Sequence, residues 1–600
     1  MAISYNNNAF IVNCCIQKRP SYVSDNSHHH NNIPLISIVK PNKKSSLPEV
    51  SLQIDVPKTM KNAVAKLIDV FVDSLFEFID KPLLPSKSNF APVEELGEAI
   101  LVTCIQGRIP TDFPEGVYIR NGPNPLFGGL KSTNSIFGKS SHIWVEGEGM
   151  LHALYFQKSS NGSWKIHYNN KHVETETYNL EKQRNKPLFL PAIEGNSMAI
   201  LSAYFFNWLR SGKANKYISN TNVFEHSGKF YSIAESHMPQ EIDILSLKTL
   251  KNWDLSADWN RPFTSHPKKA PITGELVTLG VEPIKPYAVV GIISADGKKL
   301  VHKVDIKLNR CSLCHDIGVT QRYNVIMDFP LTIDLNRLLR GGQLIKYDKK
   351  DYARIGVMPR YGDANSVKWF QVEPNCTFHI INSFEDGNEA SMSNFVDQQV
   401  VVRGCRSLDS LIPEPDPSSN EFDWLSRCYE WRLNMQTGEV KEKDPCGDKV
   451  VYMDFPMINE KYVGLKHRFA YTQIVDPIAS STTQDVPKYG GLAKLYFEES
   501  CEELSMSKQR EKDEPIKMEY HMFEKNTFCN GAAFVARDEG VEEDDGWIIT
   551  FVHNEDTNTS QVHIIDTKNF SGETVAKIEI PCRVPYGFHG AFMPISFQDQ

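Results

Sequence analysis

Long apolar runs are missing from this 600-residue sequence, and no uninterrupted run reaches the roughly 18 residues that a membrane-spanning helix needs. Long lysine- and arginine-rich runs are also missing, and the formal net charge is -9, so nucleic acid is not an expected partner. The 12 cysteines show no repeating spacing, which indicates reduced thiols rather than a disulfide framework. These absences exclude membrane-spanning helices and argue against a nucleic-acid-binding or disulfide-rich secreted protein.

The first 50 residues contain few acidic side chains, only Asp25 and Glu49, whereas serine, asparagine and lysine are frequent. This composition is typical of a transit peptide, which does not need to fold. We therefore predict that residues 1–50 form a disordered, transit-like segment that directs import into a plastid or a mitochondrion. A disordered tail without a targeting role is the alternative.

The next segment, residues 51–90, is predicted to be helical. Apolar side chains recur in it at steps of three and four, the spacing of one face of a helix. They are Met60, Val64, Leu67, Phe71, Leu75 and Phe78. We expect an amphipathic helix over residues 56–79 that either packs on the folded domain or lies on a membrane surface.

A second apolar stretch covers residues 198–209 and is followed by Arg210, Lys213 and Lys216. It is too short to span a membrane, and basic side chains at its end suit lipid headgroups. We expect a helix that inserts into one leaflet, with a buried helix capping the core as the alternative. The candidate membrane contacts are Leu201, Phe205, Phe206, Trp208 and Leu209.

Residues 91–600 have the texture of an all-β domain. Short runs rich in Val, Ile, Phe, Tyr and Thr alternate with Gly, Asn, Asp and Pro turns, as in residues 547–552 and 561–565. Many short strands over about 500 residues favour a closed architecture. A propeller with diverged blades accommodates more strands than a single sandwich or barrel, so it is the expected fold.

Four histidines far apart in the sequence are candidate metal ligands: His266, His315, His379 and His589. Local zinc motifs place ligands three to five residues apart, so no local motif applies here. In a propeller the inner strands converge on one axis, and each histidine would come from a different blade. Four neutral imidazoles suit Fe(II), Cu(II) or Zn(II), with carboxylates orienting the rings. The alternative is that these are ordinary hydrogen-bonded histidines.

The segment 311–315 has the form Cys-x-x-Cys-His, the attachment motif of c-type haem. Haem attachment requires export to a specialised compartment, and the sequence shows no secretory signal. We therefore interpret the segment as the end of a strand that presents His315.

Five sequence blocks resemble the plant carotenoid cleavage dioxygenase family, and especially its 9,10(9′,10′)-cleaving branch. They occur in family order at residues 118–125, 142–152, 353–360, 452–459 and 489–494. The resemblance implies a seven-bladed β-propeller with a helical cap, over residues 91–600. It also implies one non-haem Fe(II) per chain, dioxygen as co-substrate, and iron ligands at His266, His315, His379 and His589.

The resemblance further implies three outer-shell carboxylates, each hydrogen-bonded to one ligand histidine. Glu235 falls at the first position, and Asp454, a shorter side chain that must reach further, falls at the second. The third position falls near Gly531, where there is no carboxylate. His142 and His152 match no ligand position, so we interpret them as structural.

The function implied by the resemblance is cleavage of one carotenoid double bond by dioxygen, which yields apocarotenoid aldehydes or ketones. No Ser-His-Asp or Cys-His arrangement is apparent in the sequence, and this chemistry requires none. Cleavage at 9,10(9′,10′) is the leading expectation. Cleavage at another bond, such as 7,8(7′,8′) of zeaxanthin, and a non-catalytic carotenoid-binding propeller are the alternatives.

The expected partners and location follow from an apolar substrate that resides in membranes. Peripheral membrane association is expected, and no obligatory protein partner is inferred. Members of the 9,10-cleaving branch usually lack a transit segment and act in the cytosol, whereas residues 1–50 indicate a plastid. A plastid is therefore the expected location, with the cytosol as the alternative. Residues 389–399 resemble an insertion relative to that branch.

Overall fold

The computed structural model describes residues 58–80, 89–128, 131–235, 237–255, 259–387, 398–410, 422–481, 486–497 and 514–597. Residues 62–600 belong to one compact unit. The transit-like segment 1–50 and residues 389–397 of the predicted insertion lie outside the described residues. None of the described helices is long and apolar enough to cross a membrane.

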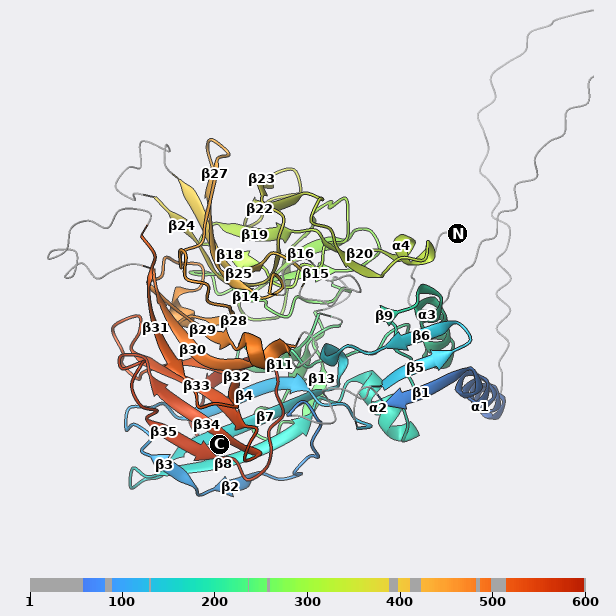
Figure 1. Ribbon diagram of the computed structural model, residues 1–600, viewed down its shortest axis with the longest axis horizontal. Helices are drawn as coiled ribbons and strands as arrows, with labels where there is room; N and C mark the ends of the chain where they lie inside the picture. Colours follow the sequence, from blue (N-terminus) through green and yellow to red (C-terminus); the bar gives the residue numbers. More distant parts are fainter. Residues whose placement is uncertain are drawn as a thin grey trace, which may run out of the picture. The chain divides into compact units, whose positions relative to one another are not determined.

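The structure is mostly β, as predicted, and five of its sheets contain four antiparallel strands each (Figure 1). Four of these five follow one another along the chain from β10 to β27. The first is β10 (Asn222–His226), β11 (Lys229–Ile233), β12 (Gln240–Ile242) and β13 (Thr249–Asn252). The second is β14 (Lys268–Lys269), β15 (Leu276–Val281), β16 (Ala288–Ile293) and β17 (Leu300–Asp305). The third is β18 (Gly318–Val319), β19 (Tyr323–Asp328), β22 (Ala353–Pro359) and β23 (Lys368–Val372). The fourth is β24 (Cys376–Asp386), β25 (Gln399–Ser407), β26 (Arg427–Asn434) and β27 (Val440–Lys443).

Two larger sheets follow the same antiparallel plan. One contains β28 (Met453–Met457), β29 (Phe469–Val475), β30 (Tyr489–Tyr496), β31 (Lys517–Met522), β32 (Thr527–Ala536), β33 (Gly546–Asn554), β34 (Thr559–Asp566), β35 (Ala576–Glu579) and β3 (Ile105–Gly107). Its two halves, β28–β31 and β32–β35 with β3, are joined by a single pair, Tyr489 with Cys529. The other has the order β2 (Ile100–Val102), β8 (Trp164–His172), β7 (Gly149–Lys158), β4 (Gly116–Pro123) and β36 (Gly590–Pro594).

Apolar side chains fill the spaces between successive sheets. Ile326 on β19 packs in one cluster with Val290 on β16, in the preceding sheet. Its neighbour Val325 packs in another cluster with Val400 and Trp431, in the following sheet. Consecutive residues of a strand point to opposite faces, so both faces of this sheet are buried. This is why strands such as β16 are continuous apolar runs rather than alternating ones.

The N-terminal helix is shorter than predicted. α1 (Lys58–Leu75) ends before Phe76, and Phe76–Asp80 form the strand β1. This strand pairs with β5 (Lys131–Ser135) in a small sheet that also contains β6 (Gly138–Ser141) and β9 (Glu194–Gly195). The prediction that the helix continues through Phe78 is therefore wrong. Phe76 and Phe78 alternate with Glu77 and Ile79, a period of two that suits a strand.

The predicted helix over residues 198–209 is confirmed as α3 (Ser197–Ser211), which Gly212 ends in the left-handed conformation. Phe205 and Leu209 are exposed, and Leu201 and Trp208 are half-buried. Phe206, predicted as a membrane contact, is instead buried, because its ring packs against Phe76 and Phe71 at centroid distances of 5.7 and 6.2 Å. The outer part of α1 stays exposed, with Leu67 and Phe71 at 70% and 55%.

The remaining short elements connect or cover the sheets. α2 (Glu176–Arg184) begins at the cap residue Thr175, whose side chain accepts from the Tyr178 amide, and α2 and α3 lie on the same side as β1 and β5 (Figure 1). A hairpin of β20 (Leu331–Ile333) and β21 (Ile345–Tyr347) encloses α4 (Leu335–Leu339). α5 (Pro477–Ser481) and the 3-10 turns Trp144–Glu146 and Glu460–Tyr462 lie in loops.

Candidate metal centre

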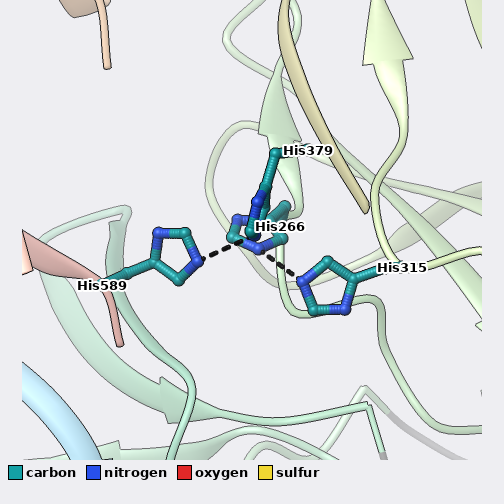
Figure 2. A group of neighbouring side chains, drawn as sticks. All are labelled: His266, His315, His379 and His589. Carbon is teal, nitrogen blue, oxygen red and sulfur yellow. Dashed lines mark hydrogen bonds between the residues drawn. The ribbon is translucent and has the colours of Figure 1, made fainter. Parts of the chain in front are cut away.

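The structure brings together His266, His315, His379 and His589, whose candidate ligand atoms all lie within 4.8 Å of one another (Figure 2). Each histidine comes from a different sheet and lies in or just before an edge strand of that sheet. His379 lies in β24, whereas His266, His315 and His589 come just before β14, β18 and β36. The sheets thus present four imidazoles to one point.

The close approach of β36 to β32 explains the glycine that follows His589. A Cβ on Gly590 would lie 1.9 Å from the carbonyl oxygen of Gly531, so no other residue fits there without moving the backbone. On its other side, β36 pairs with β4, where Gly590 lies opposite Arg120. The position of His589 is therefore fixed by backbone contacts on both sides.

Carboxylates hold two of the imidazoles by their Nδ1 atoms, as the resemblance implied. Glu235 pairs with Nδ1 of His315. Asp454 accepts from Nδ1 of His379 at 2.6 Å, so the shorter side chain reaches the ring directly. A neutral imidazole that donates from Nδ1 carries its lone pair on Nε2, the atom that faces the other histidines.

A local backbone distortion brings Asp454 within reach. The register of β28 shifts between Asp454 and Met457, and Phe455 between them adopts a left-handed conformation with φ of 52°. Bulges of this kind redirect side chains next to functional sites. The Asp454 carboxylate also accepts from Ser426 Oγ at 3.0 Å and from the Phe455 amide at 2.8 Å. Burial alone would raise the pKa of Asp454, but the contact with His379 and these hydrogen bonds lower it.

The other two histidines are kept neutral by their surroundings. Burial and the neighbouring imidazoles hold the pKa of His266 and that of His589 well below the ordinary value. Neutral imidazole is the form that binds a metal ion. Both of these histidines can therefore offer a ring nitrogen to a metal ion.

The spacing of the donor atoms fits a single metal ion. Nε2 of His266 lies 3.1 Å from Nε2 of His315, and the Nε2 atoms of His379 and His589 are also 3.1 Å apart. Two ligands about 2.1 Å from one ion and at right angles to each other are about 3.0 Å apart. Four imidazoles suit a first-row transition ion rather than Mg²⁺ or Ca²⁺, which prefer oxygen ligands.

The third outer-shell position carries an arginine side chain in place of a carboxylate. A Cβ on Gly531 would lie 2.2 Å from Cγ of Arg120, so the arginine fills this space. Arg120 is buried and donates from Nη2 to the carbonyl of Pro585 at 2.8 Å. Within the described part of the chain, no carboxylate forms an ion pair with it.

Aromatic rings flank the histidines, and no pattern in the sequence predicted their role. Phe378 stacks on His315 at a centroid distance of 5.1 Å, and Phe455 lies 5.1 Å from His379 and 4.7 Å from His589. A small cavity beside His315 is lined by the apolar side chains of Leu313, Met327, Phe329, Leu331 and Phe378, together with the polar side chains of Asp316 and Thr377. The aromatic rings and much of this lining are therefore apolar.

The other histidines and cysteines singled out in the sequence lie elsewhere. The thiols of Cys311 and Cys314 donate to the carbonyls of Glu282 and Met327, which agrees with a strand-end role for this segment. His152 is buried and hydrogen-bonds Tyr168 through Nδ1 at 2.8 Å. His142 lies 3.2 Å from Glu146. Neither belongs to the cluster of four histidines.

Comparison with known proteins identifies related chains. A family model described as retinal pigment epithelial membrane protein matches residues 90–594. The carotenoid 9,10(9′,10′)-cleavage dioxygenase of Crocus sativus is 31% identical, over 90% of this chain and 94% of that protein. The chloroplastic 9-cis-epoxycarotenoid dioxygenase NCED1 of Oryza sativa is 28% identical, over 90% of this chain and 80% of that protein.

Solved structures with the same fold are more distant in sequence. The lignostilbene dioxygenase of Pseudomonas brassicacearum has a TM-score of 0.69 at 20% identity, covering 86% of this chain and 100% of that chain. A cobalt-substituted apocarotenoid oxygenase of Synechocystis has a TM-score of 0.63 at 20% identity, covering 84% of this chain and 96% of that chain.

Proposed function

The chain belongs to the family of the retinal pigment epithelial membrane protein and the carotenoid cleavage dioxygenases, and we propose that it is a non-haem Fe(II) dioxygenase that cleaves a carotenoid double bond. The observation that carries this proposal is the convergence of His266, His315, His379 and His589 within 4.8 Å. A protein that only binds a carotenoid needs no set of four imidazoles directed at one point.

The fold in this proposal is a seven-bladed β-propeller with a helical cap. Seven antiparallel groups of strands support it: the four consecutive four-stranded sheets from β10 to β27, the β28–β31 group, the β32–β35 group with β3, and the sheet that contains β4 and β36. Four groups supply the histidines. The other three supply the outer-shell positions Glu235, Asp454 and Gly531. Each group thus contributes one position, as expected when blades surround a common axis.

Fe(II) is the ion we propose for the site, one per chain. Held by His266, His315, His379 and His589, Fe(II) would supply the activation of dioxygen, and the four electrons that reduce dioxygen would come from the double bond that is cleaved. The chain's own residues do the rest. Glu235 and Asp454 fix the rotation of their imidazoles, and Phe378 and Phe455 limit the access of water and provide flat apolar surfaces for a polyene.

The substrate we propose is a carotenoid, cleaved at the 9,10(9′,10′) bonds. This choice is supported by relatives at 31% identity that carry this name. Which bond meets the iron depends on how far the polyene enters the protein. The 7,8(7′,8′) bonds of zeaxanthin are therefore the alternative.

Peripheral membrane binding through α1 and α3 is part of the proposal. Leu67 and Phe71 on α1 and Phe205 and Leu209 on α3 are exposed apolar side chains. The two helices are in contact, because Phe71 on α1 packs against Phe206 on α3. Phe205, the neighbour of Phe206 on α3, also contacts the Phe206 ring. An exposed apolar face of this kind suits the membrane that holds the substrate. Leu201 and Trp208 remain proposed contacts at its margin.

A plastid is the location we propose, with the cytosol as the alternative. The composition of residues 1–50 supports it, and so do the names of relatives at 27–28% identity that are called chloroplastic. A fluorescent fusion of residues 1–60 should enter plastids. Retention of the fusion in the cytosol would favour the alternative.

The decisive experiment is incubation of the purified Fe(II) protein with β-carotene, zeaxanthin and lycopene separately, with products identified by mass. Paired 9,10 and 9′,10′ fragments are expected, and the His379→Ala variant should release none. Products of another mass would reassign the cleaved bond. Iron-loaded parent protein that yields no product from any polyene would favour a binding protein.

A further inference from the structure

Asp316, the residue after His315, connects three of the four histidine-bearing segments. Its Oδ2 atom accepts from the amide of Ile380, the residue after His379, at 2.9 Å. Its Oδ1 atom lies 3.2 Å from Nζ of Lys268, which is two residues after His266. A parallel backbone bridge also links Asp316 to His266. One buried carboxylate therefore touches the neighbours of three histidines.

These contacts join separate sheets. The segments carrying His266 and His315 lead into β14 and β18, and His379 lies in β24. Asp316 also accepts from its neighbouring amide, that of Ile317, at 2.7 Å, which fixes the rotation of its own side chain. The carboxylate is 2% exposed, so water does not compete for these donors. A charge-assisted bond to Lys268 and two amide bonds then hold it in one place.

We propose that Asp316 is a positioning residue of the metal centre, which sets the spacing of His266, His315 and His379 without itself binding the ion. This inference rests on the proposal that the four histidines hold a metal ion. Its physical basis is that ligands must be held to within about half an ångström for tight binding. His589 is outside this network, because it is held by the pairing of β36 with β4.

The loss of Asp316 should therefore displace three ligands and leave the fourth in place. Asp316→Asn keeps the shape of the side chain and an acceptor for the Ile380 amide, but it removes the charge that holds Lys268. Lys268→Met removes the positive charge that pairs with Asp316. Both variants should weaken metal binding, and Asp316→Ala should weaken it further.

The experiment measures the Fe(II) dissociation constant under anaerobic conditions by competition with a chelator, together with the thermal unfolding of the metal-free protein. Asp316→Asn is expected to bind Fe(II) about 10- to 100-fold more weakly than the parent. The absorption spectrum of the Co(II)-loaded variant should also change. A change in ligand geometry moves this spectrum, whereas a loss of stability alone does not.

Asp544→Asn is the matched control. Asp544 is a buried aspartate that is paired with Lys494 and Lys568 at 2.7 and 2.6 Å, and both lysines lie outside the segments that carry the four histidines. This variant should lower the unfolding temperature and leave the Fe(II) affinity and the Co(II) spectrum unchanged.

The proposal is overturned if folded Asp316→Asn binds Fe(II) as tightly as the parent. It is also overturned if Asp544→Asn weakens Fe(II) binding equally at the same loss of stability. A parent that binds Fe(II) but cleaves no polyene would reject the proposed function and leave the positioning role standing. A parent that binds no Fe(II) would reject both.

Discussion

Arg120 occupies the space that a side chain at position 531 would need, because a Cβ on Gly531 would lie 2.2 Å from Cγ of Arg120. The aliphatic part of a buried arginine side chain thus fills the space beside the third outer-shell position. Burial lowers the pKa of Arg120 to about 10, which leaves it charged at neutral pH. Two of the three outer-shell positions therefore hold a carboxylate that contacts a histidine, and the third lies next to Arg120.

Gly531→Ala should destabilise the protein more than an ordinary glycine substitution. Gly531 has a positive φ of 66°, and the new methyl group would also collide with Arg120. Overpacking of this kind adds about 1–3 kcal/mol to the conformational strain. Gly228→Ala is the control, since Gly228 has φ of 75° and nothing within 4 Å of a Cβ. Urea unfolding would measure both, and equal losses would show that Arg120 yields easily.

Asp454→Asn should weaken iron binding with little change in the fold. The substitution keeps the shape of the side chain but removes the charge that orients the His379 imidazole at 2.6 Å. Loss of such a partner typically reduces metal affinity about 10- to 100-fold. Iron content after dialysis against a chelator is the measurement. Ser426→Ala removes only a hydrogen bond to Asp454 at 3.0 Å and should have a smaller effect, so a larger one would contradict this reasoning.

The stability of the protein should fall in acid through the buried pair of Glu148 and Lys216. Burial alone would raise the pKa of Glu148, but Lys216 lowers it to about 2, below the ordinary 4.5. A lowered carboxyl pKa stabilises the fold above about pH 4.5, and this contribution is lost as the pH falls through about 2. Burial would lower the pKa of Lys216, but Glu148 and Glu181 raise it, so its contribution is lost only in strong alkali.

Glu148→Gln should therefore lower the free energy of unfolding at pH 7 by about 3 kcal/mol, and flatten its decline in acid. Urea midpoints measured from pH 3 to pH 7 would show both effects. Glu176→Gln is the control, because Glu176 pairs with Lys213 through a side chain that is 57% exposed. It should change stability by less than about 1 kcal/mol. Parallel pH profiles for the parent and Glu148→Gln would contradict the prediction.

Replacement of exposed apolar residues on α1 and α3 should reduce membrane binding. Each buried leucine or phenylalanine contributes about 1.5–3 kcal/mol to transfer out of water. The double variant Leu67→Ser/Phe205→Ser should therefore partition at least about tenfold less onto phosphatidylcholine vesicles, as measured by co-sedimentation. Ile272→Ser/Val541→Ser changes side chains that are 86% and 88% exposed elsewhere and should have no effect. Equal losses in both variants would reject a defined membrane face.

The cluster of four histidines was within reach of the sequence, because the resemblance implied metal ligands at His266, His315, His379 and His589. Spacing alone could not select these four, since the contacts between them are made only by packed sheets. The same is true of Asp316. It is visible as the neighbour of His315, but its contact with the Ile380 amide joins two sheets and follows from tertiary structure.

The two errors at the helices have a common cause. Neighbouring residues on a helix point about 100° apart, so only one of Phe205 and Phe206 can face the core. Phe206 does so because it packs against Phe76 on β1. The sequence of residues 76–80 is compatible with either a helix or a strand. Its pairing with β5 decides the outcome, and no local pattern reveals that partner.

The pairing of β36 with β4 also delays the completion of this sheet while the chain is being synthesised. Arg120 and its hydrogen-bond partner Pro585 are 465 residues apart in the chain. At about 5–20 residues per second, a ribosome takes tens of seconds to deliver the second strand after the first. During that interval one edge of β4 presents unpaired backbone groups that other nascent chains can capture. The sheet that contains β4 therefore cannot be completed until β36 has been synthesised.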